Sequence, residues 1–169
     1  MAVSSSGAFT TSLKLDPELR DRLNAPDAPA VVVVASRPED PKHYGRILAE
    51  PDGTIRKMVE YKDASEEERT LDLCNSGLMA ARAAELWPLL AQVGNDNAAG
   101  EYYLPDIVMF AAAAGRHSAV IEVPADEVEG INSREELARV EAAWQARRRA
   151  ALMAEGVSLV APETVWLAH

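Results

Sequence analysis

The sequence predicts an α/β fold in which helices cover a mixed sheet. Residues 30–35 form an apolar run with four consecutive valines and no alternation, which is typical of a strand buried on both faces. Helical patterns alternate with such runs along the chain, and this alternation indicates a layered α/β arrangement. The 169 residues, of which 48% are hydrophobic, suit one domain with a sizeable core, or one domain with an appendage.

Caps and turns divide the chain into short elements. Asp16 before Pro17 marks a helix start, and Ser65 with Glu68 forms a capping box. Residues 50–53 are a turn of the kind that joins hairpin strands, and Gly115 ends a helix. The predicted elements are a helix from 16 to about 24, strands at 30–35, 44–48 and 54–60, a short helix from 65, a strand at 71–80 interrupted by a polar trio, helices at 83–93 and 105–114, a strand at 118–123, a helix from 133 to about 155, and a last strand within 157–167.

Composition excludes several function classes. A net charge of -10 argues against a nucleic-acid binder and against binding to an anionic membrane surface. No apolar run is long enough to span a bilayer, and the Ser-rich start lacks the pattern of a signal peptide. The single Cys74 cannot form an internal disulfide, so we expect a reducing cytoplasm. His43, His117 and His169 lie far apart, without zinc-site spacing.

Two polar stretches are candidates for binding. Residues 94–106 carry amides, carboxylates and paired tyrosines between two helical patterns, and loops held by rigid elements often bind ligands. The alternative is a solvated turn whose tyrosines pack on the following helix. Asn75 lies inside an apolar strand pattern and must find hydrogen bonds, so it is either a structural clamp or a ligand contact.

Five motifs occur along the chain in one order. They are Tyr44-Gly45-Arg46-Ile47, Val59-Glu60-Tyr61-Lys62-Asp63-Ala64, Asn75-Ser76-Gly77, Asn95-Asp96-Asn97-Ala98-Ala99-Gly100-Glu101-Tyr102-Tyr103 and Val128-Glu129-Gly130-Ile131-Asn132-Ser133-Arg134. In this order and spacing, over residues 28–169, they resemble the bacterial bifunctional N-acetylglucosamine-1-phosphate uridyltransferase / glucosamine-1-phosphate acetyltransferase family. The resemblance implies a Rossmann-like nucleotidyltransferase domain with a mixed sheet, present in part and lacking its N-terminal nucleotide-binding half.

The same resemblance divides the chain into four segments. Residues 1–27 would be a poorly patterned N-terminal segment with a short helix, and residues 28–132 the sugar-binding half of the uridyltransferase domain. Residues 133–156 would be a long linker helix, and residues 157–169 the truncated start of a left-handed β-helix.

The resemblance also implies an activity and its site. In that family the domain makes UDP-N-acetylglucosamine and pyrophosphate from UTP, N-acetylglucosamine 1-phosphate and magnesium, for cell-envelope precursors. Gly45 would give the sugar phosphate a backbone contact, Glu60 would accept hydrogen bonds from sugar hydroxyls, and Asn75 would bind the sugar through its amide. Tyr103 would wall the pocket, and Asn132 would be one of two protein ligands to magnesium. Without the resemblance, the alternatives are favoured: Glu60 as a solvent-facing strand carboxylate and Asn132 as a turn residue before a helix.

The sequence departs from the family pattern in several places. Pro105 stands where the family usually has threonine, which puts sugar specificity in question, and Ser76 replaces another threonine. Residues 1–30 match neither the glycine-rich segment that holds UTP nor the aspartate that is the second magnesium ligand, and the chain ends where hexapeptide repeats would begin. We therefore expect an incomplete magnesium site and a chain that is inactive alone.

Three functional hypotheses follow, together with one expected kind of partner. The first is the sugar-binding half of a uridyltransferase, and the second is a non-catalytic sugar-phosphate-binding or partner-binding module. The third is an acidic interaction domain whose motifs serve folding alone. Because the valine-rich strand needs cover on both faces, we expect self-association or a complementing N-terminal chain.

Overall fold

The computed structural model describes residues 2–4, 15–41, 43–131 and 133–168. The chain divides into two compact units, Met1–Gly130 and Ile131–His169, here called unit 1 and unit 2. Each is described by itself.

Unit 1 is built on a mixed sheet with the strand order β4-β3-β5-β2-β6, to which β1 adds by pairing with β5. The strands β2 and β6 run parallel, whereas the other paired strands run antiparallel. The predicted mixed sheet is therefore confirmed, and β1 is an addition that a weakly patterned segment did not predict. The strands are β1 Ala2–Ser4, β2 Val31–Ser36, β3 Arg46–Ala49, β4 Ile55–Val59, β5 Cys74–Ala81 and β6 Ala119–Glu122.

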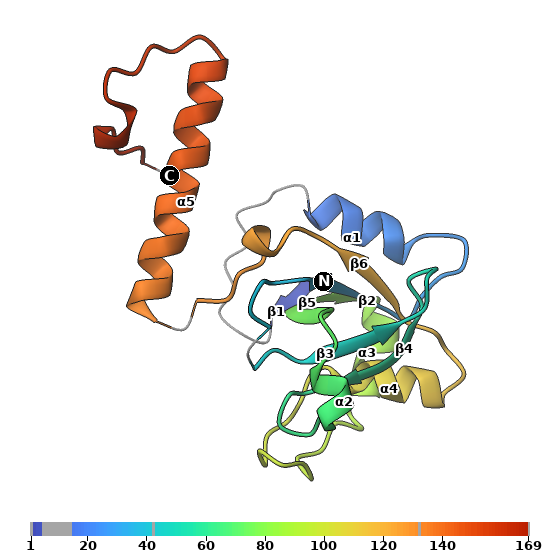
Figure 1. The fold of residues 1–169 in the computed structure, drawn as a ribbon. Coiled ribbons are helices and arrows are strands. Elements are labelled where there is room, and N and C mark those ends of the chain that lie inside the picture. The colour runs from blue at the N-terminus through green and yellow to red at the C-terminus, as the bar shows by residue number, and fades with distance from the viewer. Residues whose placement is uncertain (1, 5–14, 42, 132, 169) are drawn as a thin grey trace. The chain divides into compact units, whose positions relative to one another are not determined.

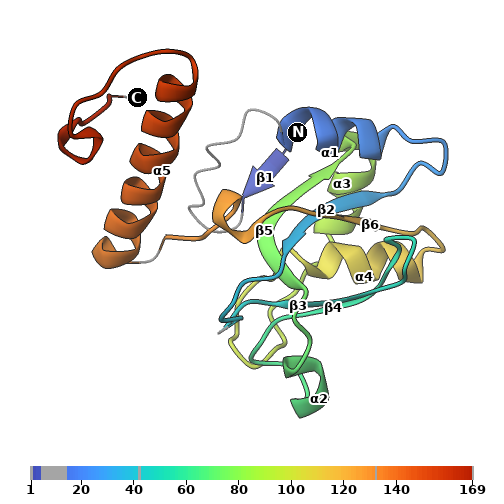
Figure 2. The same ribbon diagram turned by 45° about the horizontal axis from the view of Figure 1, so that its top comes forward.

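Helices cover both faces of this sheet (Figures 1 and 2). On one face, α1 (Leu15–Leu23) packs against Val32 and Val34 of β2. On the other face, α3 (Ala83–Leu90) and α4 (Asp106–Ala113) pack against Val31 and Val33. All four valines are 0% exposed, so the prediction of a strand buried on both faces is confirmed. The cover that these valines need comes from the helices of this chain.

The β3–β4 hairpin reaches the far strand of the sheet with its tip. Gly53 forms the turn with φ +83°, a conformation that favours glycine. The amide of Ile55 donates to the carbonyl of Ser118 at 2.9 Å, and the amide of Val120 donates to the carbonyl of Gly53 at 2.9 Å. The hairpin tip therefore pairs with β6, and these bonds join segments that are far apart in sequence.

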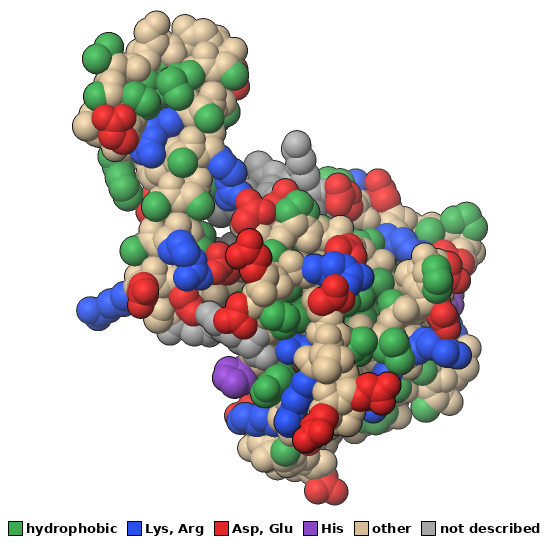
Figure 3. Space-filling model, viewed as in Figure 1, with side chains coloured by type: hydrophobic (Ala, Val, Ile, Leu, Met, Phe, Trp, Pro, Cys, Tyr) green, Lys and Arg blue, Asp and Glu red, His purple; other side chains and the backbone are tan. Residues whose placement is uncertain are grey.

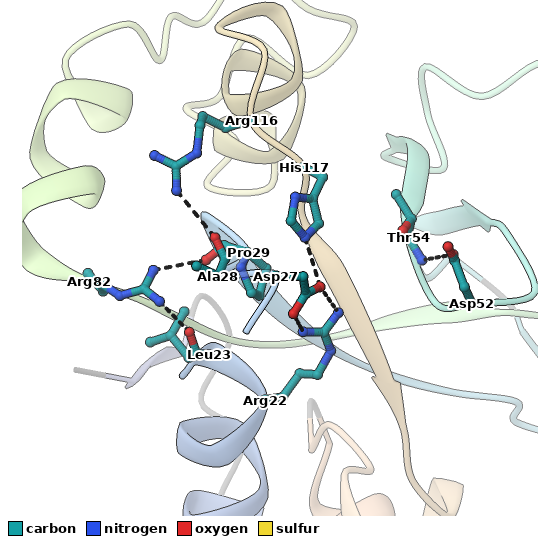
Figure 4. Close-up of polar contacts among 10 residues, drawn as sticks. All are labelled: Arg22, Leu23, Asp27, Ala28, Pro29, Asp52, Thr54, Arg82, Arg116 and His117. Atoms are coloured by element: carbon teal, nitrogen blue, oxygen red, sulfur yellow. Dashed lines mark hydrogen bonds and ion pairs between the residues drawn. The ribbon is translucent and has the colours of Figure 1, made fainter. Parts of the chain in front are cut away.

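Side chains from three parts of the chain fix the connection between α1 and β2 (Figure 4). Asp27 accepts hydrogen bonds from both terminal nitrogens of Arg22 at 2.8 Å, and its carboxylate lies 3.0 Å from Nε2 of His117. The hydrogen bond from Arg22 and then that from His117 hold the pKa of the Asp27 carboxyl far below its usual value. Arg82 and Arg116 donate to backbone carbonyls of the same connection. The entry of the chain into β2 is thereby fixed.

Acidic and basic side chains are interspersed over the face seen in Figure 3. Ion pairs of one arginine connect the segment after β2 with the end of β6 and with the segment before β5. Arg37 donates from Nε to Glu122 at 3.0 Å and also pairs with Asp72. Exposed pairs of this kind contribute only up to about 1 kcal/mol each, so they fix the local geometry more than they stabilise the fold.

The predicted capping box at Ser65 is present, and the predicted helix start at residue 133 carries a second one. Ser65 caps α2 (Glu66–Arg69) together with Glu68, and Ser133 caps α5 (Arg134–Ala154) together with Glu136. Two short 3-10 helices, η1 (Ala125–Glu127) and η2 (Pro162–Thr164), complete the described elements. No helix in the described part of the chain combines the length and the apolar character that crossing a bilayer requires.

The strand expected within residues 157–167 is a wrong prediction. The described residues 157–168 form η2 and irregular backbone, with no strand among them. The segment is held by a side chain instead of a neighbouring strand. Gln145, 1% exposed on α5, donates from Nε2 to the carbonyl of Leu167 at 2.7 Å and accepts from the Leu167 amide at 2.9 Å. No strand among the described residues of unit 2 pairs with this apolar segment, so a side chain of α5 satisfies its backbone at Leu167.

Candidate functional site

Three of the predicted site residues lie side by side across the strands β4, β3 and β5. Glu60 follows β4, Gly45 precedes β3, and Asn75 lies near the start of β5, each next to a residue of the ladders that pair these strands. The Asn75 amide donates to the Gly45 carbonyl at 2.9 Å. A Cβ built on Gly45 would stand 3.4 Å from the Glu60 carboxyl carbon. A ligand above Gly45 would therefore lie between a carboxylate and an amide.

Asn75 shapes a bulge in β5. Its Oδ1 accepts from the Gly77 amide at 3.0 Å, and Gly77 has φ +83°. The hydroxyl of Ser76 donates to the Val34 carbonyl at 2.8 Å, where the β2–β5 register shifts. The structure thus contains the hydrogen bond expected if Asn75 is a structural clamp. Asn75 is 6% exposed, and its Nδ2 donates to no acceptor among the described residues, so this donor is available to a ligand.

A partly open pocket of about 140 Å³ adjoins this row of residues. Two of the predicted residues, Glu60 and Tyr103, line it. The loop that carries Tyr103 is held against the Glu60 segment, because Asp63 accepts from the Ala98 amide at 2.9 Å. Within that loop, Asn97 Oδ1 accepts from the amides of Ala99 and Glu101. The complete lining is His43, Glu60, Tyr61, Lys62, Glu101 and Tyr103.

Acidic groups surround the inner part of the pocket. Burial raises the pKa of the half-buried Glu60, and the charges of Asp106, Asp63 and Glu101 raise it further. Burial and the charge of Asp63 raise the pKa of Asp106 as well. Partial burial, followed by the charge of Asp63 and a hydrogen bond with it, raises the pKa of Tyr103. A ligand that donates hydrogen bonds to Glu60 would relieve part of this repulsion.

Tyr61 forms a stack at the pocket wall. The guanidinium carbon of Arg69 lies 4.8 Å from the centre of the Tyr61 ring, and that of Arg46 lies 5.3 Å from it. The His43 ring meets Tyr61 edge-on, with 5.0 Å between ring centres. Arg69 also donates from Nε to the Tyr61 carbonyl at 3.2 Å. The wall is therefore held both through its ring and through its backbone.

The predicted magnesium site can be tested only in part in the described ranges. No group of three or more His, Cys, Asp or Glu side chains in the described ranges is arranged to hold a metal ion. Asn132, the predicted magnesium ligand, lies outside the described residues. Its role stays a prediction.

The structure thus brings Gly45, Glu60 and Asn75 together and places Tyr103 in the same pocket as Glu60. Sequence reasoning gave no role to four other lining residues. The motifs that carry the resemblance could have indicated three of them, because they include Tyr61, Lys62 and Glu101. His43 lies just outside such a motif. The four are His43, Tyr61, Lys62 and Glu101.

Most of the chain is similar in sequence to one set of known proteins. No protein-family model matches the chain. The bifunctional protein GlmU of Rhizorhabdus wittichii is 65% identical over 149 residues, which cover 88% of this chain and 33% of that protein. The bifunctional protein GlmU of Zymomonas mobilis is 56% identical over 151 residues, covering 89% of this chain and 34% of that protein. The chain therefore spans about a third of the length of the curated relatives it matches.

Among solved structures, a nucleoside-diphosphate-sugar pyrophosphorylase from Vibrio cholerae has a similar fold. The TM-score is 0.50 with 15% sequence identity, over 66% of this chain and 46% of that one. At this identity the likeness shows the fold alone. It agrees with the α/β fold with a mixed sheet that the sequence predicts.

Proposed function

This chain is homologous to about a third of the bifunctional GlmU proteins, and we propose that it binds the sugar phosphate in a uridyltransferase site. The ligand would be N-acetylglucosamine 1-phosphate, or the same sugar within UDP-N-acetylglucosamine. The observation that carries the proposal is the row of Glu60, Gly45 and Asn75 beside the pocket.

Each residue of the row has a group suited to a sugar. The Glu60 carboxylate accepts hydrogen bonds from hydroxyls, and such charge-assisted bonds are stronger than neutral ones. Asn75 offers its Nδ2 donor while its Oδ1 holds the bulge. Gly45 carries no Cβ, so a ligand can approach its backbone closely. Tyr103 supplies an apolar wall with a hydroxyl at its end.

The nucleotidyl transfer itself would need further groups. Transfer of this kind depends on positioning and on stabilising charge at the phosphates. Asn132 would offer one oxygen to magnesium, an ion that keeps its waters unless carboxylates or phosphates help to bind it. Because one neutral amide holds magnesium poorly, we expect sugar-phosphate binding that does not require magnesium. Titration in magnesium and in EDTA should then give the same affinity.

The remaining expectations about assembly belong to this proposal. A complementing polypeptide would supply the phosphate-binding groups, or copies of this chain would associate. In the same way, residues 157–169 would lead into a left-handed β-helix in a longer protein, and the setting would be the cytoplasm. Mixing the chain with a polypeptide that carries the glycine-rich segment, and assaying pyrophosphate release, tests the first of these.

Calorimetric titration with N-acetylglucosamine 1-phosphate tests the proposed function. We expect saturable binding that Glu60→Ala and Asn75→Ala each weaken by about tenfold or more, the scale of one lost hydrogen bond to a charged or buried group. Glu18→Ala, which removes an exposed carboxylate on α1, is the matched control and should bind like the wild type. No binding by the wild type would overturn the proposal. It would leave the acidic interaction domain as the better hypothesis.

A further inference from the structure

We infer that Asp63 is a positioning residue of the pocket: it anchors the loop of residues 95–101 and the Tyr103 side chain, and so holds them beside Glu60. Asp63 itself is exposed and does not line the pocket. The inference rests on the proposed function and deepens it, because it names the residue that keeps the sugar site assembled. Neither the resemblance nor the comparisons give Asp63 a role.

The loop of residues 95–101 is braced internally by one side chain. Asn97 Oδ1 accepts from the Ala99 and Glu101 amides at 3.1 and 3.2 Å, and its Nδ2 donates to the Glu101 carbonyl at 2.5 Å. The Gly100 amide donates to the Asn97 carbonyl at 3.1 Å, and Gly100 has φ +67°. Because these bonds close within the loop, they fix its shape but not its position relative to the pocket.

Asp63 attaches this loop to the pocket. Its Oδ1 accepts from the Ala98 amide at 2.9 Å, next to the asparagine that braces the loop. In the described part of the chain, the other hydrogen bonds of residues 95–101 stay within that loop. A charged acceptor also makes a stronger hydrogen bond than a neutral one. Asp63 is therefore the polar link between the loop and the segment that follows β4.

Tyr103 is held from two directions. Its carbonyl accepts from the Asp106 amide at 3.1 Å, at the start of α4, and its side chain forms a hydrogen bond with Asp63. An ionised carboxylate only accepts hydrogen bonds, so the tyrosine hydroxyl is the donor. The helix thus fixes the backbone of Tyr103, and Asp63 fixes the far end of its ring. Since Tyr103 and Glu101 both line the pocket, one carboxylate determines where two lining residues lie.

Asp63 and Glu60 belong to the same turn. The Asp63 amide donates to the Glu60 carbonyl at 3.0 Å, so the anchor and the proposed ligand-binding carboxylate are held at a fixed spacing. Arg69 of α2 donates from Nε to the Tyr61 carbonyl at 3.2 Å and thereby holds the middle of the turn. Ordering a binding site in advance in this way reduces the entropy lost when a ligand binds.

The charge of Asp63 acts on its neighbours as well. Burial is the largest cause of the raised pKa of Glu60, followed by the charges of Asp106 and Asp63. Burial and then the charge of Asp63 raise the pKa of Asp106. An asparagine at position 63 would offer an oxygen to the same donors without this repulsion. Two substitutions therefore separate the two effects: Asp63→Ala removes the acceptor, whereas Asp63→Asn removes the charge and keeps an acceptor.

Calorimetric titration with N-acetylglucosamine 1-phosphate and hydrogen exchange of the Ala98 amide test the inference together. Asp63→Ala should weaken binding by about tenfold and speed exchange of the Ala98 amide by about tenfold or more, because a charge-assisted hydrogen bond is lost. Asp63→Asn should keep the affinity within about threefold and retain most of the protection, since it keeps the acceptor. The denaturant midpoint should be nearly the same in all three proteins.

The pH profile of binding distinguishes positioning from a purely structural role. Glu60 accepts hydrogen bonds best when ionised, so affinity should fall as pH decreases through the raised pKa of Glu60. In Asp63→Asn this fall should lie at lower pH than in wild type, because one of the charges that raise the pKa is gone. The charges of Asp106 and Glu101 and the basic side chains of the lining remain. The phosphate of the ligand titrates in the same way in both proteins and cancels from the comparison.

Asp52→Ala is the matched control. Asp52 is an exposed carboxylate that accepts from one backbone amide, that of Thr54, at 2.9 Å, and it does not line the pocket. This substitution should leave the affinity and the exchange of the Ala98 amide unchanged. Wild-type affinity in Asp63→Ala, unchanged Ala98 exchange, or an unshifted pH profile in Asp63→Asn would overturn the inference and leave the proposed function standing. Absence of sugar-phosphate binding in the wild type would overturn both.

Discussion

Gly45 lies directly against Glu60: a Cβ on Gly45 would stand 3.4 Å from the Glu60 Oε1 and 3.3 Å from the Val59 carbonyl oxygen. These distances are tight but short of a clash, so Gly45→Ala should fold and shift the carboxylate by a few tenths of an ångström. We expect sugar-phosphate affinity to fall by about tenfold, because small displacements spoil charge-assisted hydrogen bonds. The unfolding free energy should change by only about 1 kcal/mol.

Gly94→Ala is the control for that substitution. A Cβ on Gly94 would meet nothing within 4 Å. Calorimetry and denaturant unfolding of both variants make the comparison. Unchanged affinity in Gly45→Ala would show that no ligand group uses the space above Gly45.

Two substitutions at Asn75 separate its clamp role from its proposed ligand contact. Asn75→Ala removes the acceptor for the buried Gly77 amide and should lower the unfolding free energy by about 1–3 kcal/mol while also weakening binding. Asn75→Asp keeps an oxygen acceptor but loses the Nδ2 donor. It should therefore bind the sugar phosphate at least as weakly as Asn75→Ala, and burying its carboxylate beside Glu60 should also cost stability. Wild-type affinity in Asn75→Asp would reduce Asn75 to a structural role.

Stability should depend on pH through Glu60 with a definite sign. The folded state raises the pKa of Glu60 above the usual 4.5, so the folded protein binds this proton more tightly than the unfolded chain. Stability from this group is therefore greatest at and below about pH 4.5, and it falls as pH rises through the raised pKa. Glu60→Gln should increase the unfolding free energy at pH 7 and flatten this part of the profile.

Neighbouring carboxyls shape the rest of that profile. Asp106, whose pKa is also raised, should leave a residual slope of the same sign in Glu60→Gln. Asp27 has the opposite effect, because its pKa lies below the usual 3.8. The stability that it contributes is lost only at lower pH. Denaturant unfolding between pH 4.5 and 8 therefore isolates the pocket. Parallel curves for wild type and Glu60→Gln would contradict the prediction.

Gly53 and Gly115 form a matched pair of glycines with positive φ, at +83° and +73°. A Cβ on Gly53 would stand 3.3 Å from the Val120 carbonyl oxygen, whereas one on Gly115 would meet nothing within 4 Å. Both alanine variants lose about 1–2 kcal/mol for the left-handed conformation, and Gly53→Ala should lose more because it also presses on β6. Equal losses in denaturant unfolding would show that the hairpin tip yields freely.

Local signals predicted most of the fold. The capping box at Ser65, the helix start at Ser133 and the buried valine strand depend on residues close in sequence, and all appear as expected. The strand β1 and the segment after Gly156 depend on distant partners instead. The first forms by pairing with β5, and the second is held by a glutamine side chain. Periodicity carries no information about such partners.

For the candidate site, too, some residues could be predicted from the sequence and others only from the tertiary structure. The motif order pointed to Gly45, Glu60 and Asn75, which the structure places side by side. It did not distinguish His43 and Lys62, because an exposed basic side chain in a loop has the same local pattern whether it faces solvent or a pocket. The tertiary contact between Asp63 and the Ala98 amide holds the loop of Tyr103 and Glu101 near Glu60, and His43 and Lys62 line the pocket with them.

The pairing of the hairpin tip with β6 gives two distant amides a common behaviour in hydrogen exchange. The N–H groups of Ile55 and Val120 are hydrogen-bonded only while the hairpin and β6 stay docked, since each donates to a carbonyl of the other segment. Both amides should therefore exchange with solvent through the same opening and show the same protection free energy. Loosening the turn at Gly53 should lower both together, so these two protons report whether the sheet is closed at its far strand.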